Sequence, residues 1–178
     1  MKALAMIILV ALTPVAIGAD KKAKSKTTSG EAIEQLDKLI QNSKGKVVHL
    51  RGTEHISTKE RFKPPVEIII VAKTDSTNLR LGYAADQMIF NWKVSKHQLR
   101  VDGGPADNMH KMGKGLIPTF KYVTFRWLVT PTKQEMWVDD ELRFSHVGDY
   151  SGLNEHVSVY SNNSNVTVKS ITVRKLEE

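Results

Sequence analysis

The stretch VTFRWLVTPTKQEMWV, residues 123–138, decides the fold of this 178-residue chain. Apolar side chains take every second position of its first half, with Arg126 among the residues between them. Alternation with a period of two is typical of a strand that buries one face. The segment 130–133 has the composition of a tight turn, after which Met136 and Val138 alternate with Trp137. The stretch therefore predicts two neighbouring antiparallel strands.

The same alternation recurs along most of the chain after residue 46. Strands are expected at 47–51, 66–73, 79–83, 88–94, 99–101, 122–129, 136–138, 142–144, 157–160 and 166–173. Within the last strand the alternation reverses at Lys169-Ser170, which indicates a β-bulge or a strand that changes sheets. Many short strands without crossover helices predict an all-β, antiparallel sandwich or barrel.

Two of the connections are longer than hairpin turns. Residues 102–116 contain four glycines and one proline, and connections of this length are often functional or mobile. Residues 148–155 form a second polar loop. The other breaks, at 74–77, 84–86 and 130–133, have the composition of tight turns.

The first eighteen residues have the layout of a secretory signal peptide. Lys2 precedes an apolar run, and small residues lie before a cleavage site at Ala19. A membrane anchor is the alternative, but the run is short for a span of about 20 residues and holds Pro14. The sequence therefore predicts export to the periplasm, the cell surface or the medium.

A basic linker and a short helix are expected between residues 19 and 46. Lys21–Lys26 and the polar residues after it read as a solvated linker, or alternatively as a tether to an anionic envelope surface. Residues 31–41 carry apolar side chains at helical spacing, which predicts one amphipathic helix docked on the main body. The β-sandwich domain is then expected at 47–176.

Composition excludes several classes of function. The chain has no cysteine, so disulfides, thiolate catalysis and cysteine-ligated zinc are absent. The formal net charge is +7, but part of the surplus lies in the linker. Nucleic-acid binding needs a concentrated basic stripe, and we do not expect it of an exported chain.

Several of these segments resemble one family of sandwiches. The strand carrying Trp127, the turn at 130–133, Met136-Trp137-Val138 and the acidic turn before Leu142 are similar to the paired central strands of concanavalin A-like and laminin G-like domains. The resemblance extends from Val66 to Arg174. It implies a two-sheet jelly roll, with carbohydrate binding or cleavage as the commonest activities. Fold resemblance by itself does not choose between them.

The residues do not favour catalysis. A glycosidase places two carboxyl groups about 5–9 Å apart, and the glucanases of this fold carry them on one strand. The nearest candidates are Glu135, Asp139 and Glu141, of which the first two would be about 13 Å apart on an extended strand. We therefore expect no catalytic residue, and a glycosidase-like enzyme remains the less favoured alternative.

No metal ligand or cofactor is predicted, and Ca²⁺ is a weaker alternative. The histidines show no paired metal-binding spacing, although His110 lies within the long glycine-containing loop. Oxygen-bearing residues gather at 149–154 and 102–108 without matching a defined cation motif. Asx turns and capping are the favoured explanation of these residues.

Sugar binding needs a flat aromatic ring beside planar polar side chains that bond hydroxyl groups. The alternation places Trp92 and Trp127 in the core and Trp137 on an outer face, either as a ligand platform, beneath the N-terminal helix, or simply exposed. Other side chains predicted to point outward include Arg80. The candidate ligand-binding residues are Trp137, Tyr122, Arg126, Asn91, Arg100 and His110.

The sequence therefore predicts a secreted, non-catalytic module that binds a polysaccharide or other glycan. The alternative is an envelope protein-interaction or structural domain, tethered through its lysine-rich segment.

Overall fold

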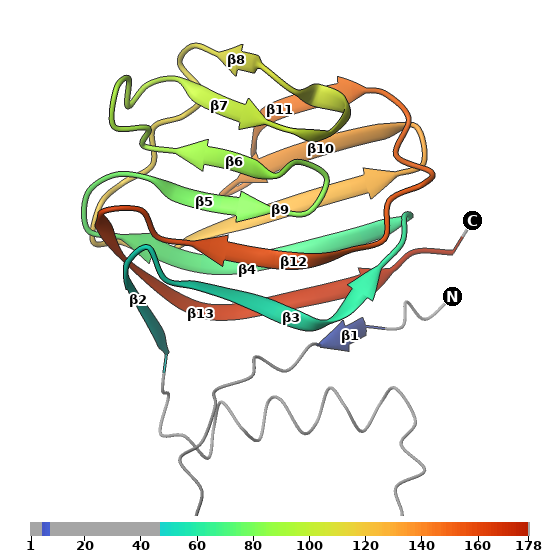
Figure 1. Cartoon of the computed structure of the whole chain (residues 1–178), viewed down its shortest axis with the longest axis horizontal. Coiled ribbons are helices and arrows are strands. Elements are labelled where there is room, and N and C mark those ends of the chain that lie inside the picture. Colours follow the sequence, from blue (N-terminus) through green and yellow to red (C-terminus); the bar gives the residue numbers. More distant parts are fainter. Residues whose placement is uncertain (1–4, 8–46, 178) are drawn as a thin grey trace, which may run out of the picture.

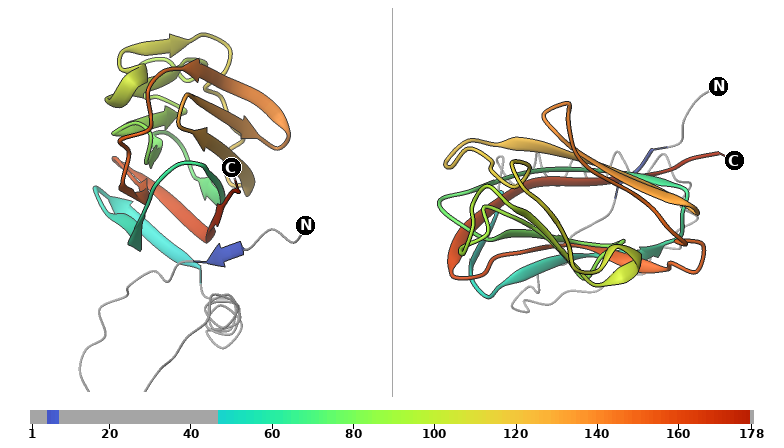
Figure 2. Two further views of the ribbon diagram at one scale, coloured as in Figure 1. Left: turned by 90° about the vertical axis from the view of Figure 1, so that its right-hand side faces the viewer. Right: turned by 90° about the horizontal axis from the view of Figure 1, so that it is seen from above.

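Two antiparallel sheets face each other in the computed structural model, which describes residues 5–7 and 47–177 (Figures 1 and 2). The predicted jelly-roll sandwich is confirmed. The linker, the amphipathic helix and most of the predicted signal peptide lie outside the described residues. Within the described part of the chain, no helix has the length and apolar character needed to cross a membrane.

The first sheet has seven strands. Its hydrogen-bonded order is β1-β13-β4-β9-β10-β11, and β2 also pairs with β13. The strands are β1 (Ala5–Ile7), β2 (Val48–Gly52), β4 (Val66–Thr74), β9 (Val123–Thr130), β10 (Lys133–Val138), β11 (Glu141–Val147) and β13 (Ser164–Lys175). The stretch at 123–138 forms β9 and β10, which pair as an antiparallel hairpin in the middle of this sheet.

The second sheet has six strands in the order β3-β12-β5-β6-β7-β8. The strands are β3 (His55–Phe62), β5 (Leu79–Gly82), β6 (Gln87–Phe90), β7 (Leu99–Asp102), β8 (Met109–Lys111) and β12 (Glu155–Tyr160). A short 3₁₀ turn, η1 (Gly104–Ala106), lies between β7 and β8.

The core fills the space between the sheets with the inward side chains of both. Strand β4 shows the rule most clearly, because its buried and half-buried residues alternate along its whole length. Trp127 and Phe125 from β9 are fully buried, and Phe125 packs against Phe90 with ring centroids 4.9 Å apart. Period two therefore places the remaining side chains of each strand on the outer faces of the two sheets.

The predicted irregularity in the last strand is a β-bulge. The pairing of β13 with β4 shifts register between Val168 and Ser170, and residues on both sides stay in the same sheet. Burial follows the shift, since Val168 and Ile171 both face the core. The bulge keeps a twelve-residue strand in contact with the interior throughout.

Three strands were not predicted, and one is shorter than expected. β1 lies within the predicted signal peptide. β3 has few apolar residues, and β8 lies within the segment predicted to be one long loop, 102–116. β6 ends at Phe90, whereas the alternation suggested a strand to residue 94. Asn91 has φ 49°, a left-handed conformation that ends the strand.

Candidate functional site

One outward-facing side chain from each strand of the six-stranded sheet falls on a single row. From one edge of the sheet to the other, the row is His55, Tyr160, Arg80, Ile89, Arg100 and His110. Neighbouring strands lie about 4.8 Å apart, so each side chain is beside the next. All members except the isoleucine carry a planar polar or aromatic group. We call these six residues the polar row.

Trp92 lies against the β7–β8 end of the polar row. Its ring centroid is 4.8 Å from Cζ of Arg100 and 5.9 Å from the ring of His110. The prediction that Trp92 lies in the core is wrong: it is half-buried. The left-handed backbone at Asn91 ends the alternation one residue earlier, which explains the error.

Arg80 occupies the middle of the polar row and is held by neutral side chains. Its Nη1 donates to Oε1 of Gln87, and the amide oxygen of Asn162 accepts from Nη2 at 2.7 Å in the orientation that satisfies both groups. Burial lowers the pKa of Arg80, Arg100 lowers it further, and Asp102 opposes the shift. The centre of the face therefore carries a positioned cation.

The next positions along the strands leave a hollow beside the row. Ser57 pairs with Ser158, and Ser158 with Gly82, which has no side chain to fill the space. A pocket of about 280 Å³ lies there, and its walls include Tyr160. A Cβ atom on Gly82 would come within 3.1 Å of that ring. The face thus combines a ridge of planar groups with a depression.

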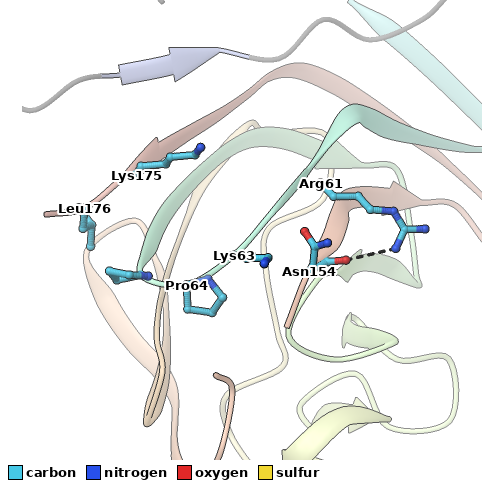
Figure 3. Close-up of a pocket in the computed structure, with 7 residues that line it drawn as sticks. Arg61, Lys63, Pro64, Asn154, Lys175 and Leu176 are labelled. Atoms are coloured by element: carbon cyan, nitrogen blue, oxygen red, sulfur yellow. Dashed lines mark hydrogen bonds between the residues drawn. The ribbon is translucent and has the colours of Figure 1, made fainter. Parts of the chain in front are cut away.

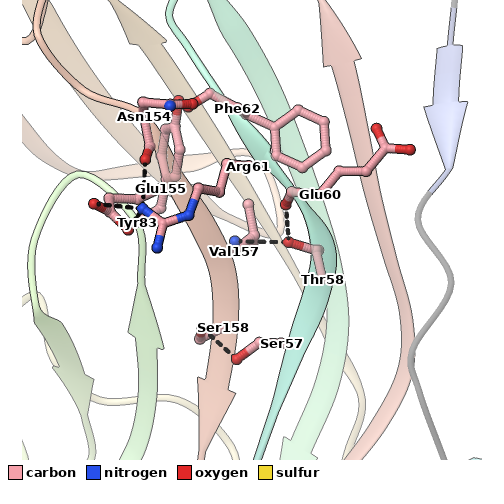
Figure 4. A network of polar contacts seen from close by, with 10 residues as sticks. All are labelled: Ser57, Thr58, Glu60, Arg61, Phe62, Tyr83, Asn154, Glu155, Val157 and Ser158. Atoms are coloured by element: carbon pink, nitrogen blue, oxygen red, sulfur yellow. Dashed lines mark hydrogen bonds and ion pairs between the residues drawn. The ribbon is translucent and has the colours of Figure 1, made fainter.

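β3 and β12 pair irregularly, and Arg61 lies on the same outer face as Ser57 on the far side of this irregularity (Figure 4). Ser57 is opposite Ser158 and Arg61 is opposite His156, so three residues of β3 face one residue of β12. Oγ1 of Thr58 fills the gap, because it accepts from the Val157 N–H at 3.0 Å and donates to a β3 carbonyl at 2.8 Å.

Three predicted site residues lie instead on the outer face of the seven-stranded sheet. The ring of Trp137 has Cζ of Arg126 4.8 Å from its centroid, and Arg126 Nε donates to Glu67 at 2.6 Å. The Tyr122 ring has Nζ of Lys73 4.9 Å from its centroid, and burial raises the pKa of Tyr122. The structure therefore divides the predicted residues, with Arg100 and His110 on one face and these three on the other.

Asn91 does not face outward, and that part of the prediction is wrong. It is 1% exposed, and its amide nitrogen donates to the carbonyls of Ser76 and Ile117. Its amide oxygen accepts from the Ile117 N–H at 2.9 Å. These contacts join the loop after β6 to the chain that leads into β9, which is a structural role.

The carboxylates suggested for glycoside cleavage are engaged elsewhere. Glu135 forms an ion pair with Lys133, and Asp139 accepts from the Thr124 N–H at 2.8 Å. Glu141 bonds Lys114 at 3.0 Å, and this hydrogen bond lowers the pKa of Glu141, whereas a general acid needs a raised one.

The two polar loops show the local bonding of turns. Asp149 accepts from the N–H and hydroxyl of Ser151, and Asp107 accepts from the Gly103 N–H at 2.6 Å. Among residues 5–7 and 47–177, no group of three or more histidine, aspartate or glutamate side chains could hold a metal ion.

Most of the polar row was not proposed as a site from the sequence. Arg80 was placed outward correctly, but no periodic signal joined it to Arg100, because their strands are separated by β6. Tyr160 follows the alternation of β12, yet only the strand order places it beside Arg80. The sequence signal that could have pointed to the row is that outward positions on several strands carry planar polar or aromatic side chains.

Comparison with protein-family models and with curated proteins finds no match. Solved structures do match over about three quarters of the chain. One match is the exoplasmic/lumenal domain of VIP36 in a Ca²⁺/Man-bound form. It aligns with a TM-score of 0.58 and 8% identity, over 75% of this chain and 80% of that one.

Two further matches have different functions in their names. A beta-glucanase of Bacillus licheniformis has TM-score 0.53 and 9% identity over 74% of this chain and 78% of that one. The carbohydrate binding module CBM66 of Bacillus subtilis has TM-score 0.52 and 9% identity over 70% and 83%. Identities this low show shared architecture, and the chain accordingly has the jelly-roll fold of the concanavalin A-like lectins and glucanases.

Proposed function

We propose that this chain is an exported, non-catalytic module that recognises glycans, with the polar row and Trp92 as its binding surface. The observation that carries the proposal is the row itself, which gathers planar hydrogen-bonding groups from five of the six strands beside one half-buried indole. Sugars present hydroxyl groups around their rim and apolar C–H groups on their faces. A surface with both kinds of partner is what such a ligand requires.

The composition of the two outer faces favours the six-stranded sheet. Around Trp137 the neighbouring outward residues include the apolar Ile69 and Leu128. The polar row instead offers guanidinium, imidazole and phenol groups next to a hollow. Trp137, Tyr122 and Arg126 remain the alternative platform.

The names of the structural neighbours support a carbohydrate ligand, since they include a beta-glucanase, a carbohydrate binding module and a Man-bound domain. Binding without cleavage is supported by the engagement of Glu135, Asp139 and Glu141 with neighbouring groups. Export through the signal peptide, and any tethering through Lys21–Lys26, stay predictions of the sequence and belong to this proposal.

The test is a glycan array followed by affinity electrophoresis of the full chain in gels that contain the polysaccharides it binds. Trp92→Ala and Trp137→Ala form a matched pair, because each half-buried ring has an arginine Cζ 4.8 Å from its centroid. We expect Trp92→Ala to weaken binding by about tenfold or more, as for a central aromatic contact. Trp137→Ala should change it less than about twofold.

Two outcomes would overturn the proposal. If the folded chain binds no glycan, the function is wrong; if only Trp137→Ala weakens binding, the site lies on the other sheet. Catalysis is checked by incubating the same polysaccharides with the protein. Release of reducing sugar that Glu135→Gln abolishes would contradict the non-catalytic assignment.

A further inference from the structure

A basic pocket lies at the corner where three strand ends of the two sheets come together (Figure 3). β3 ends shortly before Lys63, β13 ends at Lys175, and Asn154 immediately precedes β12. The Leu176 N–H donates to the Pro65 carbonyl at 3.0 Å, which closes one side of the corner. The pocket measures about 380 Å³.

Three cations surround this pocket, and their charge is only partly compensated. Arg61 pairs with Glu155 at 3.2 Å, and both side chains are about half exposed. Within residues 47–177, neither Lys63 nor Lys175 forms an ion pair. All three side chains line the same pocket, which therefore favours an anion.

Arg61 has an edge left over for such a ligand. Among the described residues, the Arg61 side chain donates only through Nη1, to the Asn154 carbonyl and to the Glu155 carboxylate. Nε and Nη2 lie on the other edge of the guanidinium and can bond two oxygens of one anionic group side by side. A carboxylate or a sulfate has that geometry.

The remaining wall of the pocket is apolar. Pro64, Pro65 and Leu176 line it beside the cations. An inorganic anion would gain little from this wall, whereas a sugar ring that bears an anionic group would place its C–H groups against it. The combination matches the chemistry of an acidic sugar residue.

The basic pocket adjoins the polar row through β3 and β12. Arg61 is opposite His156 in the register, and His156 and Glu155 line the hollow that ends at Tyr160. A single ligand can therefore contact the row and the corner along one outer face. Ser57 and Ser158, joined by a 2.8 Å hydrogen bond, lie between them.

We propose that the basic pocket of Arg61, Lys63 and Lys175 binds the anionic group of an acidic polysaccharide, at the end of the glycan surface assigned above. This inference rests on the proposed function and narrows its ligand to carboxylated or sulfated glycans. The two anionic groups share the chemistry of the pocket, and the choice of probes separates them.

The experiment measures binding of the full chain to two matched pairs of polymers by isothermal titration calorimetry. Polygalacturonate is compared with its methyl-esterified form, and dextran sulfate with dextran. The variant is Lys63→Gln/Lys175→Gln. Its control is Lys96→Gln/Lys121→Gln, which removes the same charge from exposed lysines outside the pocket.

We expect the wild type to bind one acidic polymer at least tenfold more tightly than its neutral partner. The pocket variant should lose about tenfold for that polymer, since hydrogen bonds to charged groups are the strong ones. The control variant should lose less than about twofold. A smaller salt dependence for the pocket variant than for the control would be consistent with the same site.

Equal losses in the pocket and control variants would overturn the inference, because they indicate unspecific attraction. Equal affinity for the acidic and neutral polymers would overturn it as well, while Trp92-dependent binding of the neutral polymer would leave the proposed function standing. Failure of the proposed function gives a different result from failure of this inference. In that case none of the four polymers would show Trp92-dependent binding.

Discussion

Replacing Asn91 with alanine is expected to destabilise the sandwich strongly. The amide is 1% exposed and makes two donor bonds and one acceptor bond, two of them to the peptide group atoms of Ile117. Its backbone also has φ 49°, in the region that asparagine adopts more easily than alanine.

Both effects contribute to the magnitude. In Asn91→Ala the N–H and the carbonyl of buried Ile117 lose their side-chain partner, and each buried unsatisfied group costs about 1–3 kcal/mol. The left-handed backbone adds about 1 kcal/mol for alanine. Ser76 is half-buried, and water can replace its lost bond. The free energy of unfolding should therefore fall by about 4 kcal/mol, a large share of the usual 5–15 kcal/mol.

Urea unfolding followed by tryptophan fluorescence measures this change. Asn91→Gly is the control, since it also removes the amide but relieves the backbone, and it should be about 1 kcal/mol more stable than Asn91→Ala. A loss below about 1 kcal/mol in Asn91→Ala would refute the structural role of the amide. Equal stability of the two variants would refute the backbone contribution.

Three further predictions concern the core and its turns. Gln134→Leu should cost about 2–4 kcal/mol in thermal or urea unfolding, because the indole Nε1–H of Trp127 loses its buried acceptor and the Tyr150 hydroxyl loses a buried donor; a change within about 0.5 kcal/mol would contradict this. Gly104→Ala should destabilise clearly more than Gly113→Ala in the same assay, since both have positive φ but only the former would bring a Cβ within 2.5 Å of a backbone carbonyl; equal costs would exclude the clash. Burial, and secondarily Glu155, raises the pKa of Tyr83 above its usual 10.0, so the unfolded state ionises first and stability should fall as the pH rises above 10. Ultraviolet titration of phenol ionisation checks the raised pKa. A free energy of unfolding of the wild type that stays constant above pH 10 would contradict the predicted loss of stability.

The two layers of the fold were predictable because, in these strands, the alternating apolar residues are the ones that are buried between the sheets. β4 and β9 are read correctly for this reason, and so is the irregularity in β13, where the alternation reverses at the bulge itself. β3 was missed because charged residues interrupt its apolar positions, and the Thr58 side chain compensates for its irregular pairing. That compensation depends on β12, which is about a hundred residues away.

The candidate site was predicted only in part because lateral neighbours depend on strand order. Arg100 was selected as an outward residue and His110 for its place in the long loop, and the two do lie together. Trp137 and Arg126, however, point outward from the other sheet. The face of Trp92 depended on one left-handed residue, Asn91, which the period-two rule does not foresee. Which site residues bind a ligand stays a prediction.

The proposed binding surface and the core use different residues of the same strands. Each of the six members of the polar row is flanked along its own strand by side chains of opposite orientation, and several of these, such as Leu79, Leu81 and Val101, are fully buried. Substitutions in the row can therefore change the chemistry of the proposed binding surface one residue at a time, while the interior of the domain is inherited unaltered.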